Sequence, residues 1–127
     1  MPEGNRLQEV VARDLEDEII NGKLRAGDSI PSAHELSARY EISPSTASAA
    51  TTKLARRGLV ETRRGLGLFV TASARDAVLR ERTYSFHAHY VEPMLAEAQR
   101  LGYSLRDVLG YLSAQDPVPG SASPDER

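Results

Sequence analysis

The sequence predicts a mainly α-helical fold with one small β-hairpin, followed by two further helices. Apolar residues recur at helical spacing in three segments before residue 58, and only a very short turn separates the second segment from the third. The chain then alternates apolar and polar residues on both sides of a glycine-rich turn, which is typical of a hairpin. Three helices with a hairpin after them predict a winged helix-turn-helix domain at residues 1–72.

Apolar spacing and a capping signal predict the first two helices. The first helix is expected at about residues 7–21, and its acidic side chains should face solvent: Glu9, Asp14, Glu16, Asp17 and Glu18. Ser32 and Glu35 have the spacing of a capping box, which opens the second helix. Leu36 and Tyr40 of that helix are expected to face inward.

A serine followed by a proline predicts the start of the third helix. Ser43 is expected to cap it, and Pro44 fits the first helical position because no partner for its missing amide is needed there. Ile42 should fill the space between the second and third helices. The buried stripe of the third helix is expected to be Ala47, Ala50 or Thr51, and Leu54, and Gly58 should end the helix.

The opposite face of the third helix begins with small side chains: Ser45, Thr46, Ser48 and Ala49. In helix-turn-helix proteins the N-terminal part of this helix enters the major groove of DNA. Hydroxyls can reach phosphates or base edges, and methyl groups can meet a thymine methyl. The helix N-terminus also favours a phosphate. Ser45 and Thr46 could instead only satisfy amide groups at the helix start.

The hairpin is expected to pair residues 59–63 with residues 68–71. Its tip carries the residues that we expect to reach DNA: Arg63, Arg64, Gly65 and Gly67. Arginine is favoured in narrow minor grooves, so this tip fits the wing of a DNA-binding domain. An ordinary solvated turn is the alternative interpretation.

The net charge of −2 is unevenly distributed along the chain. Residues 29–71 carry six Lys or Arg against three Asp or Glu, a balance of +3, while residues 1–28 carry −3 and residues 72–127 carry −2. The positive segment coincides with the predicted DNA-contacting elements, although a solvated surface explains the charge alone equally well. Because +3 is a modest charge, DNA affinity is expected to need two copies of the chain.

Residues 73–114 are predicted to form a helical dimerisation region. A long helix should run to about Leu101, with Pro93 kinking or dividing it, and a second helix should follow from Ser104 to about Ser113. The apolar residues expected at the dimer interface are Leu79, Phe86, Tyr90, Met94, Leu95, Leu101, Leu105, Leu109 and Leu112. Residues 115–127 are rich in Pro, Gly and Ser and are expected to be a disordered tail.

The ordered series of these features resembles the GntR family of bacterial transcription regulators over about residues 7–71. The run GKLRAGD at 22–28 is part of the resemblance, and Ser-Pro-Ser-Thr at 43–46 is similar to the Asn-Pro-Asn-Thr turn of the YtrA-like subfamily. Residues 94–112 also look like that subfamily, which has a short C-terminal region of two dimerisation helices. The resemblance implies a repressor that binds a palindromic DNA operator as a homodimer. A small-molecule effector of unknown identity could bind at the dimer interface.

Three positions depart from the pattern of the wider family, whose members carry DNA-contacting arginines there. They are occupied here by His34, Pro44 and Ser48, so DNA shape and Arg64 are expected to carry more of the specificity. The full set of residues expected to contact DNA is Ser32, His34, Ser43, Pro44, Ser45, Thr46, Ser48, Ala49, Lys53, Arg63, Arg64, Gly65 and Gly67.

Several function classes are disfavoured by composition. The chain has no cysteine, and His87 and His89 would point to different sides of a helix, so we expect no metal site, no cofactor and no catalytic residue. The charged neighbours Arg75/Asp76 and Glu81/Arg82 are interpreted as solvated helix charges. No apolar run is long enough to span a membrane and no signal peptide opens the chain, so a cytoplasmic protein is expected.

A second hypothesis is a winged helix that serves as an architectural or protein-interaction module without a specific operator. The absence of the family arginines from the third helix gives it some support. The two hypotheses differ in whether a defined DNA site is recovered in a binding selection.

Overall fold

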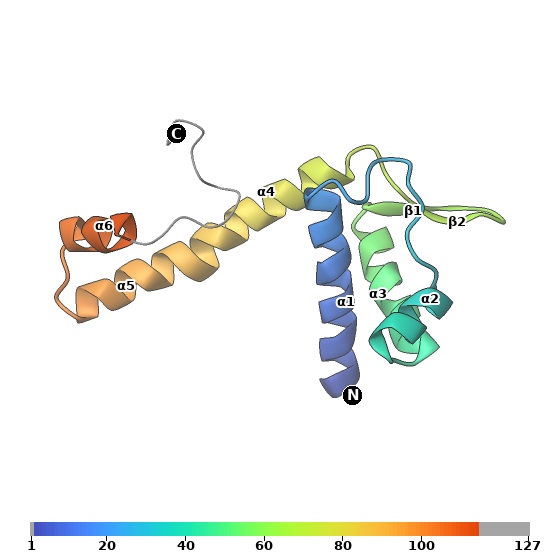
Figure 1. The fold of residues 1–127 in the computed structure, drawn as a ribbon, viewed down its shortest axis with the longest axis horizontal. Coiled ribbons are helices and arrows are strands. Elements are labelled where there is room, and N and C mark those ends of the chain that lie inside the picture. Colours follow the sequence, from blue (N-terminus) through green and yellow to red (C-terminus); the bar gives the residue numbers. More distant parts are fainter. Residues whose placement is uncertain (1, 115–127) are drawn as a thin grey trace. The chain divides into compact units, whose positions relative to one another are not determined.

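The computed structural model describes residues 2–114 (Figure 1). Its elements, in chain order, are α1 (Pro2–Ile20), α2 (Ala33–Tyr40), α3 (Pro44–Arg56), β1 (Val60–Arg63), β2 (Gly67–Val70), α4 (Ala74–Phe86), the π-helical turn η1 (His87–Val91), α5 (Glu92–Arg100) and α6 (Leu105–Ser113). The chain divides between Thr83 and Tyr84 into two compact units, which we call the head and the C-terminal unit. The tail expected at 115–127 lies outside the described residues.

The head is built around one apolar core to which its helices and both strands contribute. The buried side chains of this core are Val11, Ala12, Leu15, Ile19, Ile30, Leu36, Ile42, Ala47, Ala50, Leu54, Leu59, Val60, Val70, Ala74 and Val78. The predicted stripe of α3 is confirmed, with Ala50 and Thr51 both buried. The expected winged helix-turn-helix, mainly helical with one hairpin, is therefore the observed fold.

Helix α1 differs from the prediction in three respects. It begins at Pro2 rather than Leu7, since proline fits the first turn of a helix. Leu7 and Val10 are exposed, although apolar residues at helical spacing usually face a core. Glu16 was expected in solvent, but it is only 8% exposed because two arginines from other elements bind its carboxylate.

The turn between α2 and α3 is held by side-chain and main-chain hydrogen bonds. The predicted capping box is present: the Glu35 amide donates to Ser32 Oγ at 3.1 Å, and the Ser32 amide donates to Glu35 Oε1 at 2.8 Å. At the other end of α2, Glu41 adopts a left-handed conformation with φ 56°. Ser37 Oγ donates to the carbonyl of Ile42 at 2.6 Å, which fixes the buried Ile42 between the two helices.

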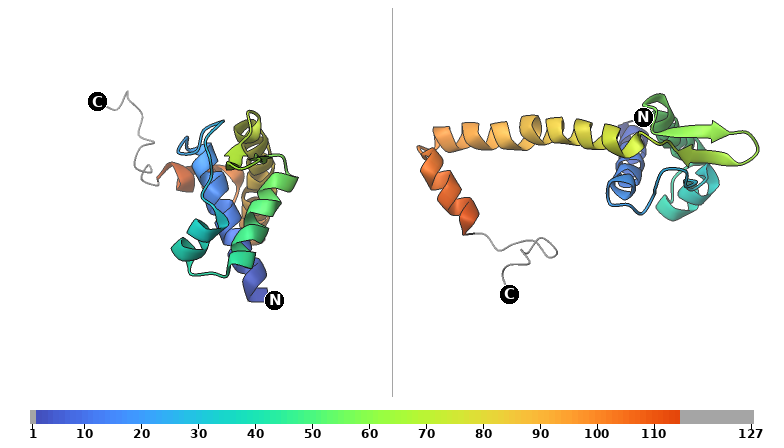
Figure 2. Two further views of the ribbon diagram at one scale, coloured as in Figure 1. Left: turned by 90° about the vertical axis from the view of Figure 1, so that its right-hand side faces the viewer. Right: turned by 90° about the horizontal axis from the view of Figure 1, so that it is seen from above.

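Strands β1 and β2 form an antiparallel hairpin that extends beyond the helices of the head (Figures 1 and 2). Its register pairs Val60 with Val70 and Arg63 with Gly67. The segment before α2 adds to it: Ser29 forms a bridge with Phe69, and the Ile30 amide donates to the Leu68 carbonyl at 3.0 Å. The hairpin is thereby tied to the segment that enters α2.

The first part of α4 belongs to the head. Ala74 and Val78 are buried in the core, which is why the compact unit extends past residue 72 to Thr83. Glu81 is exposed, as expected for a solvated helix charge, and it also pairs with Arg57. Arg82 differs from the expectation, because it is partly buried and pairs with Glu16 and Asp17. Arg75 likewise donates to the Ile20 carbonyl at 3.0 Å, so it too is engaged.

In the C-terminal unit the chain passes through η1 into α5 without leaving helical conformation. Pro93 lies in the first turn of α5, and the Glu92 amide bonds to the His87 carbonyl five residues back. This wider turn accommodates a residue that cannot donate a hydrogen bond. Helix α6 begins at a second capping box, between Ser104 and Asp107. Within the described residues, no helix is both long and apolar enough to cross a membrane.

Candidate nucleic-acid interface

Helix α3 presents a polar face opposite its buried stripe. Ser45, Ser48, Thr52 and Arg56 are all exposed, and they follow each other at spacings of three or four residues. Residues at such spacings lie one above another on a helix. The exposed face is therefore a row of hydroxyl groups that ends in a guanidinium group.

The start of α3 is a cluster of three hydroxyl groups around Ser43. The Thr46 amide donates to Ser43 Oγ at 3.1 Å, and Ser43 Oγ lies 2.9 Å from Thr46 Oγ1 and 3.1 Å from Ser45 Oγ. Capping is thus performed by Ser43, and the hydroxyl of Ser45 stays exposed beside it. Because Pro44 has no amide hydrogen and the Thr46 amide is used, the helix start offers few amides to a phosphate.

The two arginines of the hairpin have different surroundings. Arg63 lies in β1, where its guanidinium group is 4.3 Å from the centre of the Phe69 ring and 3.7 Å from the Glu61 carboxylate. Arg64 lies at the tip, where the Leu66 amide donates to the Arg63 carbonyl at 2.8 Å. Arg64 is exposed there, so it is the cation of the tip.

Glycine is required on both sides of Leu66. Gly65 has φ 77° and Gly67 has φ 113°, in the region that side chains with a Cβ rarely adopt. Leu66 itself is 71% exposed. The tip therefore combines a free cation with an apolar side chain.

A groove of about 490 Å³ separates the polar face of α3 from the hairpin. Ser48, Thr52 and Arg56 line it from α3, and Thr62 lines it from β1. Thr62 shares the face of its strand with the buried Val60, and successive side chains alternate between faces. The groove is therefore bordered by polar side chains of both elements that a winged helix uses on DNA.

Ion pairing decides which cations of the head stay available. Arg57 is bound to Glu16 and Glu81, and Arg63 is bound to Glu61. Among the described residues, Lys53, Arg56 and Arg64 take part in no ion pair. Those three belong to α3 and the hairpin tip, so the candidate interface keeps cations that a polyanion could contact. Other cations of the head, such as Arg13 of α1 and Arg39 of α2, are likewise outside the ion pairs that the described residues form.

The remaining predicted residues occupy the edges of this surface. Ser32 and His34 are exposed at the start of α2, although the Ser32 hydroxyl is engaged in the capping box. Ala49 and Lys53 are partly buried on α3, and Lys53 lines a second groove with Arg13 and Arg56. Of the predicted residues, Ser48 and Gly67 line the groove between α3 and the hairpin, and the other α3 and hairpin residues lie on the same two elements outside it. Ser32 and His34 lie at the start of α2.

Sequence reasoning missed four residues of this surface: Thr52, Arg56, Thr62 and Leu66. Thr52 and Arg56 could have been found by extending the spacing of four from Ser48 along the helix. Thr62 could not, because its position beside α3 depends on how the hairpin packs.

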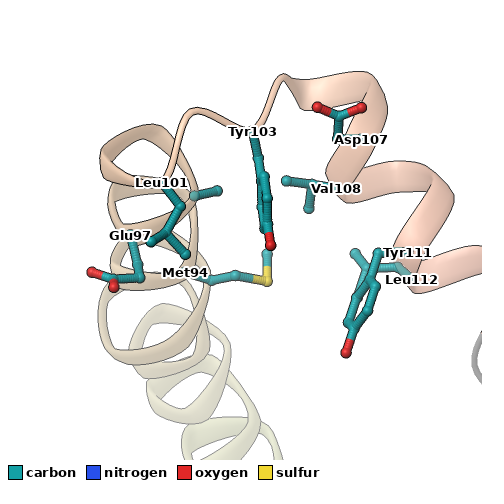
Figure 3. A pocket seen from close by; sticks show the side chains of 9 residues that line it. Met94, Glu97, Leu101, Tyr103, Asp107, Val108, Tyr111 and Leu112 are labelled. Carbon is teal, nitrogen blue, oxygen red and sulfur yellow. The ribbon is translucent and has the colours of Figure 1, made fainter.

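The C-terminal unit has a different kind of surface, which is largely apolar. Large apolar side chains are exposed along it: Phe86, Tyr90, Met94, Leu95, Leu101, Tyr103, Leu105, Leu109, Tyr111 and Leu112. A groove of about 770 Å³ opens between α5 and α6, with Met94, Leu101, Tyr103, Val108 and Leu112 among its lining (Figure 3). Of the nine residues proposed for dimerisation, Leu79 alone lies in the head.

The comparison with protein families identifies the chain. Residues 7–70 match the family described as "Bacterial regulatory proteins, gntR family". The chain belongs to the GntR family. The predicted resemblance is confirmed, and membership makes the chain a DNA-binding transcription regulator rather than an enzyme.

Two HTH-type regulators from Bacillus subtilis (strain 168) are similar over most of the chain. The HTH-type transcriptional repressor YtrA is 25% identical over 99 residues, which are 78% of this chain and 75% of YtrA. The uncharacterized HTH-type transcriptional regulator YhcF is 26% identical over 91 residues, 72% of this chain and 74% of YhcF.

Solved structures share the fold. A GntR family transcriptional regulator from Listeria monocytogenes aligns with a TM-score of 0.73 at 20% identity, covering 87% of this chain and 95% of that one. BusR from S. agalactiae, solved in complex with its busA-promotor DNA, aligns with a TM-score of 0.53 at 18% identity, covering 87% of this chain and 59% of BusR.

Proposed function

We propose that this GntR regulator is a repressor that binds a palindromic DNA operator as a homodimer in the cytoplasm. The observation that carries the proposal is the pairing of two surfaces on one chain. The head has an exposed polar face with unpaired cations, and the C-terminal unit has an unpartnered apolar face. A second copy of the chain would cover the apolar face and supply a second head.

The α3 face is proposed to enter the major groove, with the hairpin tip in the adjacent minor groove. Ser45 and Ser48 would lie nearest the base edges, because they are exposed in the first half of α3. At the tip, Arg64 suits the negative potential of a narrow minor groove, and Leu66 suits the apolar insertion that minor-groove proteins use. In this proposal the hairpin tip supplies part of the DNA recognition that other family members obtain from arginines at the positions of His34, Pro44 and Ser48.

The homodimer is proposed because α5 and α6 expose many large apolar side chains. Leu105 is 65% exposed and Leu109 is 56% exposed on a helix of nine residues. Contiguous apolar patches of this kind mark interaction sites. A symmetric dimer would bury the same patch on both chains and present two heads to two half-sites. We assign the α5–α6 groove to the second copy rather than to a small-molecule effector.

The repressor role rests on YtrA, whose name describes a transcriptional repressor and which is 25% identical to this chain. A dimer that occupies an operator can block access of the transcription machinery to a promoter. An architectural or protein-interaction module is the alternative, and it would need no defined operator.

The experiment is a binding selection on genomic fragments with the purified protein at about 150 mM salt, together with its mass in solution. Recovery of a two-half-site palindrome and a dimeric mass would support the proposal and identify the regulated genes. Salt-sensitive binding without a shared sequence would favour the architectural module. Expression of a reporter behind the recovered site, with and without the protein, then tests repression.

A further inference from the structure

We propose that the groove between α3 and the hairpin is a seat for one strand of the DNA phosphate backbone, with Arg56 as its charged contact. The proposal rests on the proposed function for its docking geometry. It assigns a DNA-positioning role to Thr52, Arg56 and Thr62, which the sequence did not single out.

The geometry follows from the two grooves of DNA. If α3 lies in the major groove and the hairpin tip in the neighbouring minor groove, the strand that divides these grooves must pass between the two elements. The described head has a groove of about 490 Å³ at this place. Its walls are α3 on one side and β1 with β2 on the other.

The chemistry of the walls suits a phosphodiester. Three exposed hydroxyl residues line the groove, Ser48, Thr52 and Thr62, and each can donate one hydrogen bond to a phosphate oxygen. Arg56 stands four residues after Thr52 on the same face of α3. Among the lining residues, Arg56 is the charged one, so an anion would meet no carboxylate there.

Arg56 is also the cation that the fold leaves available at this point. Its neighbour Arg57 is committed to Glu16 and Glu81, whereas the described residues include no ion pair of Arg56. The guanidinium group can bind phosphate oxygens in a bidentate manner, which fixes the register of a protein on DNA. The seat therefore positions α3 in its groove and reads no sequence.

The test measures binding to random-sequence duplex DNA between about 50 and about 200 mM salt, since phosphate contacts are independent of sequence. We expect Arg56→Ala to weaken binding about tenfold and to lower the salt slope by about one for each head bound. Arg56→Lys should keep the slope while recovering part of the affinity, because it keeps the charge but loses the bidentate geometry. Arg80→Ala, an exposed arginine of α4, is the matched control and should change neither quantity.

Thr62→Val separates the hydroxyl contact from charge. It keeps a β-branched residue on β1, and we expect about threefold weaker binding with an unchanged salt slope. Unchanged affinity and slope in Arg56→Ala would overturn the seat, even if the wild-type chain selects an operator. Recovery of no operator by a wild-type chain that still depends on Arg56 for DNA binding would overturn the proposed specific function and leave the seat standing.

Discussion

Glu16 is the carboxylate around which the ion pairs of the head are arranged. It lies in α1 and binds Arg57, at the end of α3, and Arg82, in α4. Arg57 also binds Glu81, and Arg82 also binds Asp17 at 2.8 Å. A buried charge is costly unless it is paired, so these arginines allow Glu16 to be buried. These ion pairs link α1 to the end of α3 and to α4.

Replacing Glu16 by Gln should destabilise the head by about 2 kcal/mol, because Arg57 and Arg82 both lose their buried partner. Urea unfolding at one fixed protein concentration measures the difference. The control is Glu9→Gln, an exposed acidic residue of the same helix, which should shift the free energy of unfolding by less than about 0.5 kcal/mol. Equal stability of the two variants would show that these ion pairs contribute nothing.

Tyr40 makes the stability of the head sensitive to alkaline pH. Partial burial and the hydrogen bond from its hydroxyl to Asp14, at 2.7 Å, raise the pKa of Tyr40 to about 12. The raised pKa means that the folded state favours the neutral phenol. The contribution of the neutral Tyr40 phenol to the stability of the head is thus complete below about pH 10, the ordinary pKa of tyrosine. It is lost as the pH rises toward 12.

Tyr40→Phe should remove this dependence. The difference in phenolate absorbance between wild type and variant should titrate near pH 12, and the variant should lose less stability between about pH 10 and 12. A difference spectrum that titrates near pH 10 would contradict the assignment.

The hairpin tip offers a comparison between a charged and an apolar contact. Arg64→Ala should weaken operator binding and lower the salt slope by about one for each head bound, because one ion contact is lost. Leu66→Ala should weaken operator binding with the slope unchanged, since the lost contact is apolar. Binding isotherms over a series of salt concentrations measure both. If Arg64→Ala leaves operator affinity intact, the wing does not contact DNA.

At the scale of elements, α3 is one helix with two separate tasks. Its buried stripe packs in the core, and its hydroxyl face is exposed. Ser43 joins the tasks, since its side chain accepts from the Thr46 amide and contacts the hydroxyls of Ser45 and Thr46. A cap therefore holds the hydroxyl groups that we propose to meet DNA.

Two serine substitutions separate these tasks. Ser43→Ala should cost about 1 kcal/mol of stability, because the helix start loses its cap. Ser45→Ala should change stability by less than about 0.5 kcal/mol yet weaken operator binding, because Ser45 is exposed and caps no amide. Thermal unfolding and operator binding, measured on both variants, check the contrast. A Ser45→Ala variant with wild-type operator affinity would contradict the proposed contact.

At the scale of the whole molecule, charge and apolar surface are divided between the two units. The net charge is −2, yet the segment of residues 29–71 is positive, and folding engages its Arg57 and Arg63 in ion pairs. Few unpaired cations remain on the elements that we propose to contact DNA, so one head alone should bind DNA weakly. In the proposed homodimer, the apolar C-terminal unit would join two heads.

Leu109→Asp on α6 should convert the protein to a monomer and weaken operator binding by at least about tenfold, since a charge cannot be buried unpaired at an interface. Gln99→Asp, an exposed polar residue of α5, is the control and should stay dimeric. Mass in solution and operator affinity are measured on both. A Leu109→Asp chain that remains dimeric would place the interface elsewhere.

The sequence alone determined the local order of this protein: which segments are helices, where Ser32 and Ser43 cap them, and that a hairpin follows. These features depend on neighbours within a few residues, so spacing and capping chemistry specify them. Tertiary structure decided the roles of charges far apart in the chain, such as Glu16 with Arg57 and Arg82. It also decided that Pro93 is accommodated by a π-helical turn and that Thr62 and Arg56 line the same groove. Such partners come together only when helices and hairpin pack, and no local pattern encodes that packing.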